Sequence, residues 1–426
     1  MSRSLHLLSC LSRFPSRPLR CHRVFRIKLL SSIMVLLVAL YVGPAAYSAE
    51  LPGGEYVALG DSYASGFGVS PYESGTDVDG GNECKRSTAA YPQLVGQRIG
   101  RTPAFHACSG ARTGDLYQAK TAWDEPAQLD ALSQSTGVVT LSIGGNDAGF
   151  AQVLGDCIGG WRILPFITCS GDKQITDRVD SAIDALGGTG EQDGIHSYEQ
   201  IMGDIASRAP NATVVAVGYP SFYSSQGRVG GIIPGRCEGV KKVDQRWITA
   251  KTNELNTALK AAALRHGYTF ADPADSFAGH ELCGPSGSWF YGLFSDGRFH
   301  PTADGQTALA GTVVDALGTG AAQGAFALPV MAAAATAQAD NARPEADPVI
   351  TRDGDQLTLD ASDSTDSDGA VVGVDWYIER ADGTEEVLSG TRASVTIPAD
   401  EAVSVTAVVT DDQGKEDFAT TVFPAS

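Results

Sequence analysis

Three short segments of the chain carry the residue types that acyl-transfer chemistry requires. Ser62 supplies a hydroxyl group, which becomes a nucleophile when a neighbouring base removes its proton. Asn146 supplies a side-chain amide that can donate a hydrogen bond to a developing oxyanion. His300 supplies an imidazole, the most frequent general base of enzymes. Together these groups are the working parts of a serine hydrolase.

Each segment also has a purely structural explanation. Residues 60–62 could form a turn in which the serine only caps a helix, and residues 144–147 could be an ordinary glycine-rich loop. A single histidine is more often structural than catalytic, but Pro301 restricts the backbone of His300 and so limits where its ring can point. Ala64 stands where the second glycine of a G-x-S-x-G elbow would be, which argues against an α/β-hydrolase.

The elements that must position these groups alternate between strands and helices. Short apolar runs predict strands at 56–59, 104–107, 138–143, 213–218 and 268–271. Helical spacing predicts helices at 181–186, 198–208, 253–266 and 302–317. This alternation predicts an α/β fold with a doubly wound, flavodoxin-like parallel sheet. Ligands bind such sheets at the carboxyl ends of the strands, where the chemical segments lie.

The joint pattern resembles the SGNH (GDSL-type) hydrolase family over roughly residues 51–317. Gly60-Asp61-Ser62 matches its first block, Ser109-Gly110 its second, Gly144-Gly145-Asn146-Asp147 its third and His300-Pro301 its fifth. The chain is most similar to the secreted actinomycete esterases and lipases of this family.

The resemblance implies a mechanism and the residues that carry it. Ser62 would be the nucleophile, activated by His300, and would form an acyl-enzyme that water then hydrolyses. The oxyanion hole would consist of the N–H groups of Ser62 and Gly110 and the amide of Asn146. We expect no metal or organic cofactor.

One position departs from the family pattern. The usual aspartate three residues before the histidine is replaced by Gly297, and Asp296 lies four residues before it. We expect the backbone carbonyl of Gly297, rather than the side chain of Asp296, to orient the ring of His300, which leaves a Ser–His dyad. A carbonyl can fix the tautomer but adds no full negative charge.

The cysteines and the N-terminus predict export. Seven basic residues precede the first acidic one, an apolar run covers 29–42, and small residues follow, which is typical of a signal peptide at 1–49. An uncleaved anchor is the alternative. Six of the eight cysteines lie beyond this leader, which indicates three disulfides with fifteen conceivable pairings. The family resemblance implies the pairs Cys84–Cys108, Cys157–Cys169 and Cys237–Cys283.

Composition divides the remaining chain into three parts. We expect a catalytic domain at 50–320, an alanine-rich linker at 321–347 and a β-sandwich at 348–426, where apolar residues alternate. The last part resembles a PKD-type Ig-like domain, with Trp376 in its core. It could act as a spacer or attach the enzyme to a surface or polymer. Its acidic segment 360–368 could bind calcium, although a solvated turn is favoured because EF-hand spacing is lacking.

These observations predict a secreted, monomeric carboxylic ester hydrolase that acts on acyl or lipid esters. The net charge of −19 argues against a nucleic-acid partner, which would need basic surface. A polysaccharide O-acetylesterase and a non-catalytic binding protein remain alternatives. His280 is a second candidate base, for which a structural role is favoured, and aromatic residues just before His300 could line an acyl pocket or pack in the core: Trp289, Phe290, Tyr291 and Phe294.

Overall fold

The computed structural model describes residues 51–159, 164, 166–231, 233, 235–320 and 341–425. The expected signal peptide and residues 321–340 of the expected linker lie outside these residues. Within the described residues, no helix combines the length and the apolar character needed to cross a membrane.

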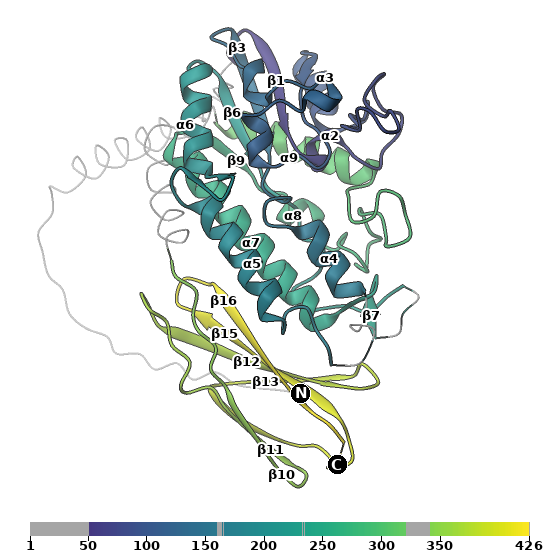
Figure 1. The fold of residues 1–426 in the computed structure, drawn as a ribbon, viewed down its shortest axis with the longest axis vertical. Coiled ribbons are helices and arrows are strands. Elements are labelled where there is room, and N and C mark those ends of the chain that lie inside the picture. The colour runs from purple at the N-terminus through teal and green to yellow at the C-terminus, as the bar shows by residue number, and fades with distance from the viewer. Residues whose placement is uncertain are drawn as a thin grey trace, which may run out of the picture. The chain divides into compact units, whose positions relative to one another are not determined.

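A five-stranded parallel sheet forms the centre of the first part of the chain (Figure 1). Its strands follow the order β2-β1-β3-β6-β9, the flavodoxin-like order, which confirms the predicted fold class. The strands are β1 (Glu55–Gly60), β2 (Pro103–Phe105), β3 (Thr136–Ser142), β6 (Thr213–Val217) and β9 (Thr269–Ala271). Every residue of β3 is buried, because helices cover both faces of the sheet.

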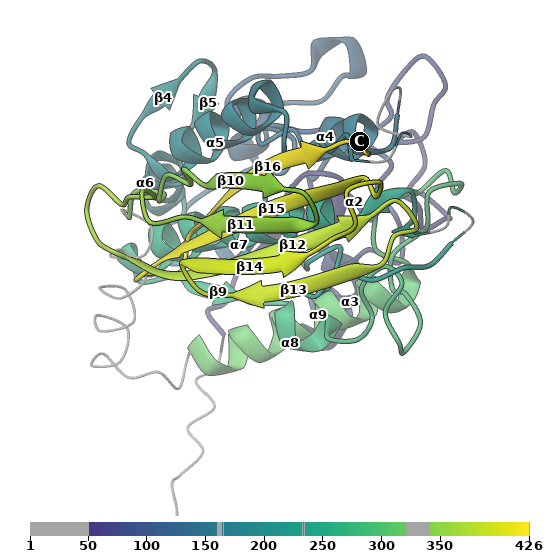
Figure 2. The ribbon, with the colours of Figure 1, turned by 90° about the horizontal axis from the view of Figure 1, so that it is seen from below.

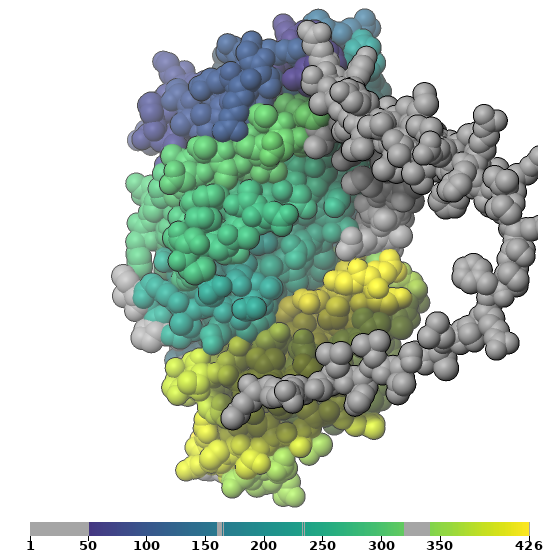
Figure 3. Space-filling model, turned by 180° about the vertical axis from the view of Figure 1, so that it is seen from behind, coloured from purple at the N-terminus to yellow at the C-terminus, as the bar shows by residue number. Residues whose placement is uncertain are grey.

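Two groups of helices cover this sheet. On one side α3 (Tyr91–Ile99) packs against α9 (Ala303–Gly320), and in the space-filling view the green surface of α9 adjoins the blue surface that contains α3 (Figure 3). In the other group α5 (Lys173–Gly187) and α6 (Tyr198–Arg208) pack against α7 (Lys242–Arg265). Neither α3 nor α4 (Phe150–Ile158) was expected from the sequence, and α7 begins eleven residues earlier than expected.

Smaller elements connect these layers. The short helices are α2 (Ser62–Ser65) and α8 (Ala274–Phe277), with 3-10 turns at Thr113–Leu116, Thr121–Trp123 and Gln128–Ala131. Two small hairpins consist of β4 (Glu191–Gln192) with β5 (Ile195–His196), and of β7 (Arg236–Cys237) with β8 (Val240–Lys241).

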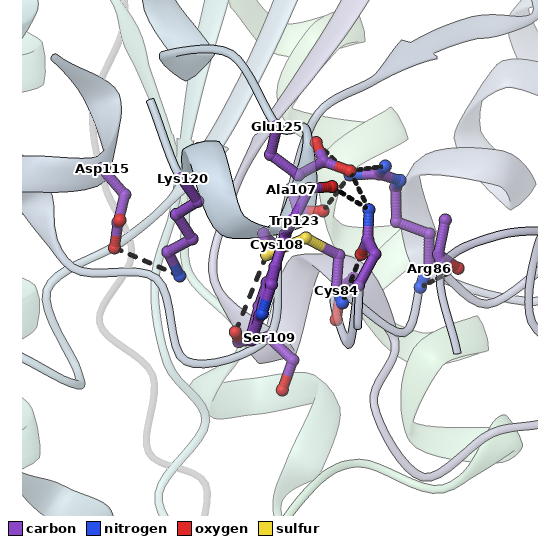
Figure 4. The surroundings of a disulfide bond; sticks show 12 residues. Cys84, Arg86, Ala107, Cys108, Ser109, Asp115, Lys120, Trp123 and Glu125 are labelled. Carbon is purple, nitrogen blue, oxygen red and sulfur yellow. Dashed lines mark hydrogen bonds and ion pairs between the residues drawn. A yellow bond between two sulfur atoms is a disulfide. The ribbon is translucent and has the colours of Figure 1, made fainter. Parts of the chain in front are cut away.

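Three disulfides join Cys84 to Cys108, Cys157 to Cys169 and Cys237 to Cys283, the pairs that the family resemblance implied. Figure 4 shows the first of them beside the ion pair between Arg86 and Glu125. This disulfide and the hydrogen bond from the Ser109 N–H to the Cys84 carbonyl fix the loop that contains Gly110.

The C-terminal part is a sandwich of two antiparallel sheets (Figure 2). One sheet contains β10 (Val349–Asp353), β11 (Gln356–Asp360) and β14 (Arg392–Thr396). The other contains β13 (Glu385–Ser389), β12 (Val371–Arg380), β15 (Val403–Asp411) and β16 (Glu416–Phe423). Trp376 is fully buried in the core as predicted, and its indole N–H donates to the Gly390 carbonyl at 2.8 Å.

Candidate active site

The structure places Ser62 at the carboxyl end of β1, as the first residue of α2. Gly60 makes this tight connection with a φ of +140°, and a Cβ at Gly60 would come within 2.3 Å of the Ser142 carbonyl oxygen of the neighbouring strand. Asp61 then caps α2 by accepting a hydrogen bond from the Tyr63 N–H at 2.9 Å. The serine is therefore held by a backbone that only glycine permits.

His300 lies against Ser62, although 238 positions separate them in the sequence. The distance from His300 Nε2 to Ser62 Oγ is 2.8 Å, which suits proton transfer from the hydroxyl to the ring. The histidine loop is also tied to the nucleophile helix, because the Tyr63 hydroxyl donates to the Phe299 carbonyl at 2.9 Å. The fold thus brings together the two groups that the sequence singled out as nucleophile and base.

The group that orients the imidazole differs by one residue from the expected one. His300 Nδ1 lies 2.9 Å from the carbonyl oxygen of Arg298, whereas the Gly297 carbonyl accepts the main-chain N–H of His300 at 3.0 Å. The reason is the left-handed backbone of Phe299, with φ of 62°, which turns the chain so that the Arg298 carbonyl faces the ring. Within the described residues, no hydrogen bond links the Asp296 side chain to His300.

Burial sets the protonation state of the imidazole. Desolvation lowers the pKa of His300 to about 4, and the backbone carbonyl groups of Arg298 and, to a smaller extent, of the expected Gly297 only partly oppose this effect. The ring is therefore neutral at physiological pH. A neutral ring whose Nδ1–H is held by a carbonyl presents the lone pair of Nε2 to the Ser62 hydroxyl, as a general base must.

The three expected oxyanion donors, Ser62, Gly110 and Asn146, follow the adjacent strands β1, β2 and β3, with β1 in the middle. Asn146 lines the same cavity as Ser62, and its side-chain N–H donates to the Ala111 carbonyl at 2.9 Å, which fixes the orientation of the amide. Asp147 accepts hydrogen bonds from the Thr113 N–H at 3.0 Å and the Thr113 hydroxyl at 2.8 Å, and so ties this loop to the one that follows Gly110. Gly110 has φ of 75°, a left-handed conformation that glycine adopts readily.

Tyr219, at the end of β6, is a residue of this site that the sequence analysis missed. Its hydroxyl donates to Asp61 Oδ2 at 2.5 Å and accepts the Gly145 N–H at 3.0 Å. One hydroxyl therefore connects Asp61, the residue before Ser62, to Gly145, the residue before Asn146. Its position directly after a predicted strand is the only signal that could have drawn attention to it.

Asp61 is a buried carboxyl group beside Ser62. Desolvation raises the pKa of Asp61 to about 7, and the hydrogen bonds from Tyr219 and Tyr63 limit the rise. The nearby charge of Asp147 adds to it. The pKa of Asp61 is raised because burial of the charged carboxylate beside Ser62 costs folding free energy.

An apolar cavity of about 520 Å³ opens next to Ser62, Asn146 and His300. Its apolar lining residues include Phe67, Phe150, Leu154, Ile158, Phe222 and Leu293. The four aromatic residues named above as possible pocket residues are not among those that line it. Phe290 instead packs in the core against Phe222 and Phe277, while Phe294 is exposed.

The other candidate groups lie apart from this cavity. His280 stacks on Trp289 with ring centroids 3.7 Å apart, and its Nδ1 lies 2.8 Å from the Gly287 carbonyl, which agrees with the favoured structural role. In the C-terminal sandwich, Asp360 pairs with Arg392 at 2.8 Å, and the preference for a solvated turn over calcium binding at 360–368 stays a prediction.

The chain is similar to several known proteins. Residues 58–308 match the model of the GDSL-like Lipase/Acylhydrolase family. The chain is 37% identical over 287 residues to Lipase 1 of Streptomyces coelicolor, covering 65% of this chain and 92% of the relative. It is 34% identical to the extracellular lipase of Streptomyces rimosus, with a TM-score of 0.48 over 62% of this chain and all of that one. The C-terminal part is 24% identical to the PKD1 domain of Vibrio anguillarum Epp, with a TM-score of 0.18 over 20% of this chain and 93% of that one.

Proposed function

The chain belongs to the GDSL-like lipase/acylhydrolase family and is an ester hydrolase, and we propose that it cleaves acyl or lipid esters through an acyl-enzyme formed on Ser62. The observation that carries this proposal is the 2.8 Å contact between Ser62 Oγ and a neutral His300 Nε2 at the mouth of an apolar cavity.

In the first half-reaction, His300 Nε2 accepts the proton of Ser62 while Oγ attacks the ester carbonyl carbon. The N–H groups of Ser62 and Gly110 and the amide of Asn146 stabilise the oxyanion. Collapse of the tetrahedral intermediate expels the alcohol, which takes the proton from His300. In the second half-reaction His300 accepts a proton from water while the water oxygen attacks the acyl carbonyl carbon, and His300 then returns this proton to Ser62 Oγ as the bond from Oγ to the acyl carbon breaks and the carboxylic acid leaves.

The substrate class follows from the cavity wall. Burial of the methylene groups of an acyl chain against phenylalanine, leucine and isoleucine side chains stabilises the bound substrate, whereas these side chains form no hydrogen bonds with sugar hydroxyl groups. This lining favours acyl and lipid esters over an acetylated polysaccharide, whose acetyl group is a single methyl.

We also propose that the protein is secreted and that its chain is divided into four parts. Three disulfides support secretion, because they persist in oxidising surroundings. We take residues 1–49 as the signal peptide, 50–320 as the catalytic domain, 321–347 as the linker and 348–426 as a domain that attaches a monomeric enzyme to a surface or polymer.

The test is hydrolysis of p-nitrophenyl esters from acetate to decanoate by the purified protein. We expect turnover that rises with chain length beyond acetate and that disappears in Ser62→Ala or after treatment with a serine-reactive phosphonate. Turnover confined to acetate, together with release of acetate from acetylated xylan, would instead identify an O-acetylesterase. A folded protein inactive on all of these esters would contradict the proposal.

A further inference from the structure

One face of α4 forms a wall of the cavity beside Ser62. The lining residues of this helix are Phe150, Ala151, Leu154, Gly155, Ile158, and Gly159 just after its end. They recur at the spacing of a single helical face. Phe150, Leu154 and Ile158 contribute bulk, whereas Ala151 and Gly155 are exposed to the open space of the cavity.

Gly155 occupies an unusual position for a glycine. It lies in the interior of α4, where glycine costs about 0.5–1 kcal/mol relative to alanine, and its φ is not positive, so the backbone conformation does not require glycine. A Cβ built at Gly155 meets no atom within 4 Å. Neither the backbone nor packing explains the glycine, but the free volume it leaves opens into the cavity.

The position of Asn146 indicates how a substrate would lie along α4. Asn146, the proposed oxyanion donor, precedes the first residue of α4 by four positions, so the ester group lies near the N-terminal end of the helix. The acyl chain would then run along α4 towards Ile158. From Phe150 to Ile158 the helix rises about 12 Å. An extended hydrocarbon advances about 1.25 Å per carbon, given C–C bonds of about 1.5 Å. The wall therefore matches about eight to ten carbons.

We infer that Gly155 determines the acyl chain length the enzyme accepts, by leaving room for the middle of a medium-length chain over α4. The inference rests on the proposed function. Because side chains of a helix lean towards its N-terminus, a larger residue at 155 would extend over Ala151 towards Ser62 and fill the path of the chain.

The experiment compares kcat/KM for p-nitrophenyl acetate, butyrate, octanoate and decanoate in the wild type, Gly155→Ala, Gly155→Leu and Gly155→Phe. We expect Leu and Phe to lower kcat/KM for octanoate and decanoate on the order of 10- to 200-fold. Acetate should change by less than about threefold, because its chain ends before the blocked region, and butyrate, whose chain reaches the edge of that region, should lose less than octanoate. We call kcat/KM for octanoate divided by kcat/KM for acetate the chain-length ratio. Gly155→Ala should have a chain-length ratio between that of the wild type and that of Gly155→Leu. None of these variants should unfold the protein, since each replaces a helix-interior glycine by a better helix former.

Gln152→Leu is the matched control. Gln152 is exposed on the same helix but lines a different cavity, so this variant should keep the wild-type chain-length ratio. The inference would be overturned if Gly155→Phe kept the wild-type chain-length ratio, because this result means that kcat/KM is unchanged or falls equally for all four esters. Absence of ester turnover in the wild type would overturn the proposed function itself, and this result is distinguishable because the variants then have no ratio to change.

Discussion

In the loop that contains Ser62, a buried carboxyl group lies next to the serine, whereas in the loop that contains His300 only main-chain carbonyl groups lie next to the imidazole. Asp61 accepts hydrogen bonds from the Tyr63 N–H and the Tyr219 hydroxyl, directly beside the nucleophile. His300 Nδ1 faces the Arg298 carbonyl. A buried carboxyl group thus supports the backbone around the proposed nucleophile, whereas a main-chain carbonyl group orients the proposed base.

Burial moves the two groups in opposite directions for one physical reason. Desolvation disfavours a charge, so it raises the pKa of Asp61 to about 7 and lowers the pKa of His300 to about 4. A neutral imidazole can accept the serine proton at physiological pH. It gains no ionic stabilisation from its orienting group once it is protonated, since a carbonyl carries only a partial charge.

The largest effect should come from breaking the contact between the two loops. Ser62→Ala or His300→Ala should lower kcat about 10⁴- to 10⁶-fold, because each removes a group that bonds to, or transfers a proton from, the reacting atoms. The double variant should be little worse than either single one, since the pair acts as a unit. Unchanged circular dichroism would serve as the control, and a loss below tenfold for His300→Ala would assign the base elsewhere.

A smaller loss should follow from disconnecting the nucleophile loop alone. Tyr219→Phe removes the hydroxyl that links Asp61 to the Gly145 N–H, and so loosens both Ser62 and the loop of Asn146. We expect kcat to fall about tenfold, as for a lost buried hydrogen bond of 1–2 kcal/mol, with little change in KM. Tyr223→Phe is the matched control, because the Tyr223 hydroxyl is buried but has no hydrogen-bond partner within the described residues. Equal kinetics for the two variants would remove Tyr219 from the site.

The sequence predicts those features of the site that depend on residues close together in the chain. Ser62, Asn146 and His300 lie at strand ends or turns, which short sequence motifs indicate. Apolar runs predict all five strands of the parallel sheet. The helix α4 also had a local signal, since Phe150, Val153, Leu154 and Cys157 recur at helical spacing.

Other features have no local signal. Tyr219 lies 158 positions from Asp61, and only the sheet order brings their strand ends together. The shift from the Gly297 to the Arg298 carbonyl depends on the positive φ of Phe299, which the residue type itself disfavours. Tertiary contacts impose this conformation, among them the hydrogen bond from the Tyr63 hydroxyl to the Phe299 carbonyl.

The buried carboxyl group should be visible in the pH dependence of stability. Asp61 titrates near its ordinary pKa of 3.8 in the unfolded chain and near 7 in the folded protein, so the folded state binds the extra proton between these values. Its contribution to the free energy of unfolding therefore falls as the pH rises from about 4 to 7. Asp61→Asn should abolish this dependence, and the difference between variant and wild type should change by about 2–4 kcal/mol between pH 5 and pH 8 in urea titrations. Parallel curves for the two proteins would contradict the raised pKa.

The smallest effect is expected at Asp296, and it is the sharpest test of the comparison between the loops. Where a carboxylate orients and stabilises the catalytic imidazole, its replacement by asparagine costs about 10⁴-fold in kcat. Here the Arg298 carbonyl holds Nδ1, so Asp296→Asn should change kcat less than about threefold, because only a charge at the edge of the cavity is lost. The measurement is kcat for p-nitrophenyl butyrate at low and at high salt. A loss approaching 10⁴-fold would mean that Asp296 contacts the ring during turnover and that the histidine loop uses charge after all. A small loss that salt removes would instead show that the ring of His300 is held by the backbone alone, because screening abolishes long-range effects of a charge but leaves a main-chain hydrogen bond intact.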